Sequence, residues 1–229
     1  MSIDRRTLMA AGLMAGAAAT MPLAAEAPAP AFVPQPLPFG PAGIAGLSAK
    51  LLTSHHDNNY VGAVKRLGAI RQDLAALDMA TAPGFLLNGL KREELIAWNS
   101  MILHELYFAG LGRGNRPGVA LSAAIERDFG SHARWSAEFA AMGKALSGGS
   151  GWVLLTWSSR DSRLVNQWAA DHSMTLAGGT PLLALDMYEH AYAIDYGAKA
   201  AAYVDAFMAA TDWTNADRLF AQAVGGVRD

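Results

Sequence analysis

The sequence predicts an α+β protein, in which an N-terminal antiparallel helical hairpin precedes a C-terminal domain with a three-stranded antiparallel sheet surrounded by helices. Between residues 47 and 106, apolar side chains recur at helical spacing over two long segments. After the Gly-rich residues 148–151, short apolar runs alternate with turns instead. A loop rich in Gly, at residues 110–118, separates the two patterns. We therefore expect a helical hairpin domain at residues 42–114 and an α+β domain at residues 115–229.

The N-terminus has the composition of an export signal. An arginine pair at residues 5–6 precedes an apolar stretch at residues 10–21, and Ala25 and Ala27 form a small-x-small cleavage site. The stretch is shorter than the roughly 20 residues that a spanning helix needs, and a membrane anchor is the alternative interpretation. We expect a twin-arginine-type signal peptide at residues 1–27, a periplasmic protein, and no stable membrane association after cleavage.

A proline-rich lead-in at residues 28–41 comes next, because six of the ten prolines fall there and disfavour packed secondary structure. Past residue 46 the pattern becomes helical. The side chains that share one face are Leu47, Leu51, His55, Asn59, Ala63, Leu67, Ile70 and Leu74. We expect a long helix that buries His55 and points His56 elsewhere, although a lone histidine at such a position is more often a core residue than a ligand.

A second long helix is expected from about residue 90 to the loop at residues 110–118, after a Pro-Gly break at residues 83–84. His104 lies in the middle of this helix. Two long helices joined by a short break form an antiparallel hairpin. Such a hairpin can aim His55 and His104 at one point.

The C-terminal domain is expected to open with two amphipathic helices, at residues 119–129 and 133–146. Two apolar runs joined by a turn then predict a pair of strands, and a third strand ends at Leu185. The paired strands are expected at residues 152–157 and 163–168, with the turn at 158–161 and closing helices at 204–208 and 213–224.

The composition excludes several classes of function. The formal net charge of the chain is only -2, which gives no electrostatic basis for binding nucleic acid. The chain has no cysteine, so disulfides, thiolate zinc sites, iron-sulfur clusters and cysteine nucleophiles are all excluded. Any metal must therefore be held by His, Asp or Glu.

Asp186 and His190 stand four residues apart at the end of an apolar run, residues 181–185. The run predicts a buried strand that delivers Asp186 to its end. The pair alone is weak evidence, because an Asp that caps a helix beside a packed His gives the same pattern. With His55 and His104 upstream, the set becomes three imidazoles and one carboxylate, which is typical of a first-row transition-metal site.

Several spaced motifs carry a resemblance to a known family. The C-terminal motif Asp186-x-x-Glu-His-Ala-Tyr192 resembles the metal-binding motif of the iron/manganese superoxide dismutases, and the segments that begin at Ser54 and His104 resemble the regions of that family's first two ligands. The likeness runs from about Leu37 to Ala223. It implies a superoxide dismutase with one Fe or Mn ion per subunit, held by His55, His104, Asp186 and His190.

The resemblance also implies residues around the metal. His172 falls where the family has a Gln or His that hydrogen-bonds solvent on the metal and sets the redox potential. Trp152 would line the same pocket, and Tyr188 stands where the family usually has Trp. Glu189 resembles the residue that pairs across a homodimer, or a higher homo-oligomer, with the partner subunit's His190.

The departures from the family concern the route into the site. Asn59 replaces the usual His four residues after the first ligand, Ala63 replaces the gateway Tyr at eight, and Ala193 stands where many members have a second Tyr. Either Tyr60, which lies nearby, or ordered water must then supply protons.

Two cationic positions of the family are also lost, because Asn58 and Gly197 replace the Lys and Arg often found there. These changes concern steering and protons, not metal binding. The predicted function is therefore a superoxide dismutase that acts on superoxide as its small-molecule substrate. The alternatives are a catalytically attenuated relative that keeps the fold and the metal, and a metal-dependent hydrolase. The hydrolase is disfavoured because no carboxylate outside the ligand set is evident as a general base.

Overall fold

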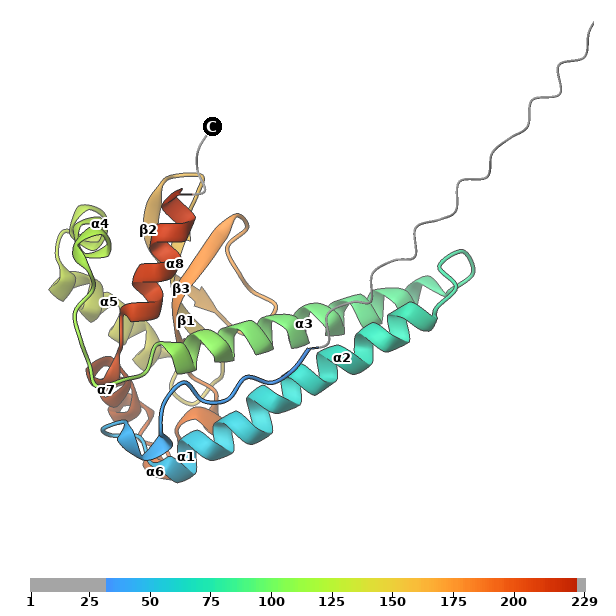
Figure 1. Cartoon of the computed structure of the whole chain (residues 1–229), viewed down its shortest axis with the longest axis horizontal. Coiled ribbons are helices and arrows are strands. Elements are labelled where there is room, and N and C mark those ends of the chain that lie inside the picture. The colour runs from blue at the N-terminus through green and yellow to red at the C-terminus, as the bar shows by residue number, and fades with distance from the viewer. Residues whose placement is uncertain (1–31, 226–229) are drawn as a thin grey trace, which may run out of the picture. The chain divides into compact units, whose positions relative to one another are not determined.

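The computed structural model describes residues 32–225. The expected signal peptide at residues 1–27 lies outside these residues, as does the start of the proline-rich lead-in. The first half of the described chain is a hairpin of two long helices that lie side by side (Figure 1). Its elements, after a short 3-10 turn at Pro41–Gly43, are α1 (Ala49–Ser54), the π-helical segment η2 (His55–Tyr60), α2 (Val61–Ala76) and α3 (Gly84–Ala109).

Helices α1, η2 and α2 run without a break, and η2 explains how one face stays buried. Residues at a spacing of four drift by about 40° per step around an α-helix, because each α-helical residue turns the chain by about 100°. A π-helical turn takes more residues and so counters this drift. Leu51, His55 and Ala63 are all buried, and Asn59 is half-buried.

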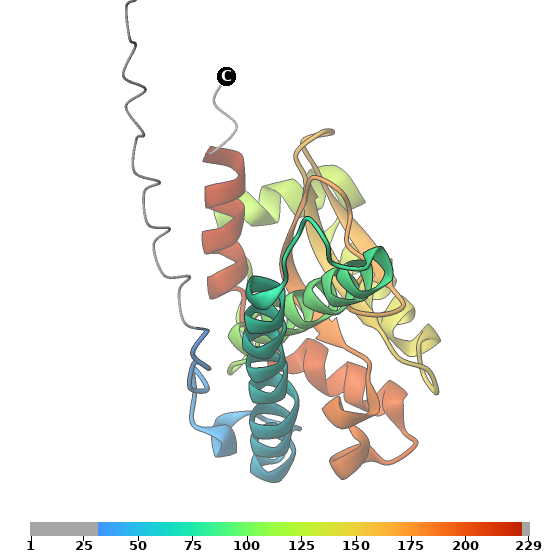
Figure 2. The ribbon, with the colours of Figure 1, turned by 90° about the vertical axis from the view of Figure 1, so that its right-hand side faces the viewer.

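The start of α3 differs from the expected one. The helix begins at Gly84, directly after Pro83, and not near residue 90. The expectation rested on the apolar pattern, but the first turn of α3 lies outside the core, since Phe85 is 83% exposed and Leu86 is 40% exposed. Figure 2 views the hairpin from this end, where α2 turns into α3.

The second half of the chain is the expected three-stranded antiparallel sheet among helices. The strand order is β2-β1-β3, so β1 is central and all of its residues are buried. The elements are α4 (Val119–Phe129), α5 (His132–Ala145), β1 (Trp152–Ser158), β2 (Arg163–Ala169), β3 (Gly179–Asp186), η3 (Glu189–Ala191), α6 (Ala193–Tyr196), α7 (Ala200–Ala210) and α8 (Thr214–Gly225).

The sheet register places two residues of the predicted site opposite each other. Trp152, at the start of β1, pairs with Asp186, at the end of β3. The register shifts between Leu155 and Thr156, opposite Pro181, where a residue without an N–H is tolerated on an edge strand. Helix α3 packs against β3, and this contact brings the hairpin and the sheet together.

The two halves share one hydrophobic core. The main cluster includes Leu51 and Leu103 from the hairpin together with Leu154 from the sheet and Phe207 from α7. A smaller cluster fills the far part of the hairpin and is made of Leu67, Ile70, Leu74 and Ala97. Within residues 32–225, none of the helices has the length and apolar character needed to cross a membrane.

Candidate metal centre

Four side chains from four separate elements meet in the interior. His55 is the first residue of η2, His104 lies within α3, Asp186 ends β3 and His190 lies in η3. Each offers one ligand atom, and these atoms all lie within 4.8 Å of one another. The four residues predicted as ligands from the sequence are therefore brought together.

Asp186 lies at the centre of this cluster. Its Oδ2 atom is 3.1 Å from the Nε2 atoms of both His55 and His190, and 3.6 Å from Nε2 of His104. The Nε2 atoms of His104 and His190 are 3.4 Å apart. His55, His104 and Asp186 are almost completely buried, whereas His190 is about one quarter exposed at 24%.

The local sequence fixes the orientation of Asp186. The apolar residues of β3 bury the strand, so its end lies inside the protein. The Tyr188 backbone N–H donates to Asp186 Oδ1 at 2.8 Å, and this bond turns Oδ2 towards the histidines. The Tyr203 hydroxyl donates to the Asp186 backbone carbonyl at 2.8 Å and holds the end of the strand from the other side.

The protonation of His104 is fixed by its neighbour one turn earlier. The Nδ1 atom of His104 lies 2.6 Å from the Ser100 carbonyl, which can only accept, so Nδ1 carries the proton. The lone pair of Nε2 is then free and faces the cluster. The Ser100 hydroxyl lies 3.4 Å from the same Nδ1 atom, so the carbonyl is the closer partner.

The charges of the cluster suit a cation. Burial lowers the pKa of His104 to about 3 and also lowers the pKa of His55, so both rings are neutral at neutral pH. Burial alone would raise the pKa of Asp186, but the nearby His190 and hydrogen bonds from His190 and His55 hold it well below its usual range. Within the described chain, Nδ1 of His55 is buried without a hydrogen-bond partner.

The donor set fits a first-row transition metal. Three imidazole nitrogens and one carboxylate oxygen are the ligand types that iron and manganese accept. Ligands must be deprotonated to bind a metal, and the lowered pKa values of His55, His104 and Asp186 meet this condition. The cluster can therefore hold one such ion without a change of protonation in these three residues.

The other residues predicted near the metal form one wall of the site. Trp152 Nε1 donates to His172 Nδ1 at 2.9 Å, so the proton of a neutral His172 ring is on Nε2. The Tyr188 ring stacks between His172 and His190, with centroid distances of 4.8 and 5.4 Å. The rings of His104 and Trp152 pack edge to face, with their centroids 5.3 Å apart. His172, Trp152 and Tyr188 thus support one another beside the cluster.

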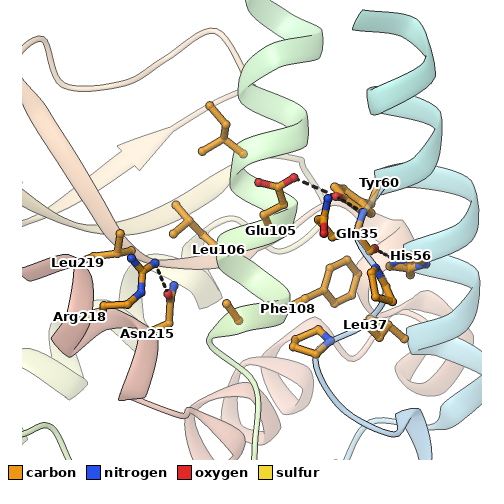
Figure 3. Close-up of a pocket in the computed structure, with 14 residues that line it drawn as sticks. Gln35, Leu37, His56, Tyr60, Glu105, Leu106, Phe108, Asn215, Arg218 and Leu219 are labelled. Carbon is orange, nitrogen blue, oxygen red and sulfur yellow. Dashed lines mark hydrogen bonds between the residues drawn. The ribbon is translucent and has the colours of Figure 1, made fainter. Parts of the chain in front are cut away.

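Tyr60 lies on a different face of its helix. Its hydroxyl donates to Glu105 Oε1 at 2.9 Å and accepts from the Gln35 N–H at 2.9 Å (Figure 3). It lines a mostly apolar cavity of about 420 Å³, which it shares with His56 and Phe108. Burial raises the pKa of Tyr60 to about 12. The structure therefore does not bring Tyr60 to the route into the cluster, although its place in the sequence suggested that it could lie there.

A second cavity, of about 210 Å³, is lined by Ala63, the position where the resemblance to the family led us to expect a gateway tyrosine. It lies between the two helices of the hairpin and reaches His172. We call it the gateway cavity, and its lining residues are Asn58, Asn59, Gly62, Ala63, Arg66, Ile96, Ala97, Ser100 and His172. The expectation missed Arg66, although its place three residues after Ala63 on a helix puts the two on one face.

Glu189 is exposed, and it makes no ion pair within residues 32–225. Its neighbours in sequence, Tyr188 and His190, both face the cluster. An exposed carboxylate directly beside a metal-ligand candidate is free to meet a second chain. The predicted role of Glu189 in a dimer stays a prediction.

Comparisons with known proteins agree with this site. Residues 117–219 match the family model for the C-terminal domain of iron/manganese superoxide dismutases. "Superoxide dismutase [Fe]" of Cupriavidus metallidurans is 70% identical over 190 residues, which are 83% of this chain and 96% of that protein. "Superoxide dismutase [Mn] 1" of Halobacterium salinarum is 35% identical over 77% of this chain and 88% of its own length. "Superoxide dismutase [Fe]" of Aquifex aeolicus is 32% identical over 80% of this chain and 89% of its own length.

Proposed function

The chain belongs to the iron/manganese superoxide dismutase family, and on this premise we propose that it converts superoxide to oxygen and hydrogen peroxide. One Fe or Mn ion per subunit is held by His55, His104, Asp186 and His190. The observation that carries the proposal is the convergence of these four side chains in a chain 70% identical to a named iron superoxide dismutase.

A bound iron or manganese ion supplies the one-electron exchange with superoxide. The protein supplies three imidazoles and one carboxylate, and because imidazoles bind a metal in their neutral form, the ligand set carries a charge of -1. His172 presents its Nε2–H as a hydrogen-bond donor, because its Nδ1 already accepts from Trp152. Such outer hydrogen bonds are the main means by which a protein tunes the potential of a metal site.

Water in the gateway cavity supplies the protons that hydrogen peroxide requires. Tyr60 is held by Glu105 and Gln35 on another face, and Ala63 has no ionisable group. The gateway cavity is large enough for several waters, and Asn59, Ser100 and His172 offer them polar partners.

The alternative of a catalytically attenuated metal-binding relative is not favoured, because the ligand set is complete and the similarity covers nearly all of the iron enzyme. One experiment separates the two functions. Metal content by mass spectrometry and superoxide turnover are measured on the same sample. The enzyme should show turnover proportional to bound Fe or Mn. A fully metal-loaded protein with negligible turnover would instead support the binding protein.

We propose that the protein is exported by a twin-arginine-type signal and acts in the periplasm, which is supported by the composition of residues 1–27. Replacing Arg5 and Arg6 together by Lys should leave the protein in the cytoplasm, because the export machinery reads the arginine pair. The measurement is the activity in periplasmic and cytoplasmic fractions. Unchanged periplasmic activity in the double variant would argue against this route.

We also propose a homodimer or higher homo-oligomer in which Glu189 meets the partner subunit's His190. Support comes from the exposure of Glu189 and the partial exposure of His190. Glu189→Ala should weaken the dimer and lower metal retention together, whereas Glu138→Ala, which removes another surface carboxylate, should do neither. Sedimentation and metal content report the two effects. A dimeric Glu189→Ala protein with full metal would show that Glu189 is only a surface residue.

A further inference from the structure

The gateway cavity has a basic side chain at its edge. Arg66 lies on α2, three residues after Ala63, and both line the cavity with His172. The Arg66 side chain is 55% exposed, so its guanidinium meets solvent as well as the cavity. Arg66 therefore offers a positive charge both to solvent and to a cavity that His172 also lines.

Arg66 shares its ion-pair partner with a second arginine. Arg66 Nη2 pairs with Glu93 Oε2, and Arg92 Nη1 pairs with the other oxygen of the same carboxylate at 2.9 Å. Two guanidinium groups thus share one carboxylate, and the group of three carries a net charge of about +1. Burial is the main cause of the lowered pKa of His172, and Arg66 is one of the charges that lower it further.

Two other basic side chains of the hairpin, Arg71 and Lys91, make their contacts away from the gateway cavity. Arg71 lies over the rings of Phe32 and Trp98, at 5.4 and 5.2 Å from their centroids, and none of these residues lines the gateway cavity. Lys91 pairs with Glu94. Among residues 32–225, Arg66 is the one basic residue besides His172 that lines the cavity.

We propose that Arg66, which shares Glu93 with Arg92, draws the superoxide anion into the gateway cavity. The proposal rests on the proposed function, since superoxide is the anion concerned. A cation beside a narrow cavity raises the local concentration of an anionic substrate and so its rate of entry. The effect weakens with salt, because the Debye length falls from about 30 Å at 0.01 M to about 3 Å at 1 M ionic strength.

The first test compares Arg66→Gln with Lys65→Gln. Lys65 is the adjacent exposed residue on the same helix and does not line the cavity, so both changes remove one positive charge. At equal metal content, Arg66→Gln should lower kcat/KM for superoxide about two- to tenfold at low ionic strength, with less difference at high ionic strength. The kcat/KM of Lys65→Gln should stay close to that of the parent protein. Equal losses in both variants, or no loss in Arg66→Gln, would overturn the proposal.

The second test removes a negative charge beside Arg66 instead of a positive one, so the expected change in kcat/KM is an increase. Glu93→Gln removes the carboxylate that Arg66 and Arg92 share, so it should raise kcat/KM at low ionic strength. Because the Glu93 side chain is about one third exposed, at 31%, and Gln has nearly the same shape, the variant should fold. A lowered or unchanged value, at equal metal content, would contradict the role assigned to Arg66.

A third measurement does not depend on turnover. Azide, a small monovalent anion, is titrated into the iron-loaded protein and followed by visible absorption. Arg66→Gln should raise its dissociation constant about two- to tenfold at low ionic strength, and Lys65→Gln should not. If the parent binds azide in this Arg66-dependent way but has no turnover, the proposed function fails and the anion-guiding role survives. If the parent is active but Arg66→Gln leaves the dissociation constant of azide unchanged, the role of Arg66 is refuted while the proposed function stands.

Discussion

Asp186→Asn is expected to give a folded protein that retains almost no metal and loses more than about a hundredfold in superoxide turnover. The loss should exceed the about 10–100-fold typical for residues outside the ligand set. Asp186 Oδ2 lies within 3.6 Å of all three histidine Nε2 atoms, so a change at this oxygen affects the surroundings of every other ligand atom. An amide there removes the negative charge and can place N–H groups against the imidazoles.

The control is Asp205→Asn, which removes a carboxylate from an exposed ion pair with Lys144. Exposed pairs of this kind contribute about 0–1 kcal/mol, so this variant should keep both metal and turnover. Metal content by mass spectrometry and circular dichroism of the fold are the measurements. An Asp186→Asn protein with a full complement of metal would show that the four side chains meet for another reason.

His172→Ala is expected to leave the metal bound but to lower turnover about 10–100-fold and to shift the midpoint potential. The change removes the Nε2–H donor beside the cluster and leaves the buried Trp152 N–H without its acceptor. His172→Gln should recover part of both properties, since one amide can accept from Trp152 and donate through its own N–H.

A histidine elsewhere provides the control for this result. His132 packs against Trp135 and Trp213, and none of these lies in the cluster. His132→Ala should therefore leave the potential of the metal-loaded protein unchanged. If His172→Ala alters stability but not the potential, His172 is a packing residue and the hydrogen-bond partner of the site lies elsewhere.

The fold could be predicted where local sequence and packing agree. Helix α4 has the expected bounds, because its apolar face faces the core and Gly130, at a φ of 85°, ends it in a conformation that favours glycine. The predicted start of α3 was wrong because Phe85 and Leu86 belong to a helix without facing the core. The short η3 and α6 were not predicted, since three or four residues carry no periodic pattern.

The candidate ligands could be predicted because each lies in a motif with its own spacing. Tyr60 is close to His55 in sequence, yet it lies four residues after His56, and the rings of Tyr60 and His56 are 5.2 Å apart beside the apolar cavity. Residues four apart lie on the same face of a helix. Since His56 was expected to face away from the metal, Tyr60 should have been expected to face away from it too. Arg66 could not be ranked above other surface cations from the sequence, because the gateway cavity forms only when the two helices pack together.

The π-helical segment η2 limits how this site can be redesigned or transplanted. Each residue added to or removed from an α-helix rotates the remainder of the helix by about 100°. A deletion that converted η2 to ordinary α-helix would therefore turn Ala63 and Arg66 away from the cavity while His55 stayed with the cluster. Grafting the four ligands onto a straight helical bundle would therefore copy the metal site without the cavity beside it. Insertions and deletions within residues 55–60 should accordingly be tolerated far less than in the exposed turn between α2 and α3.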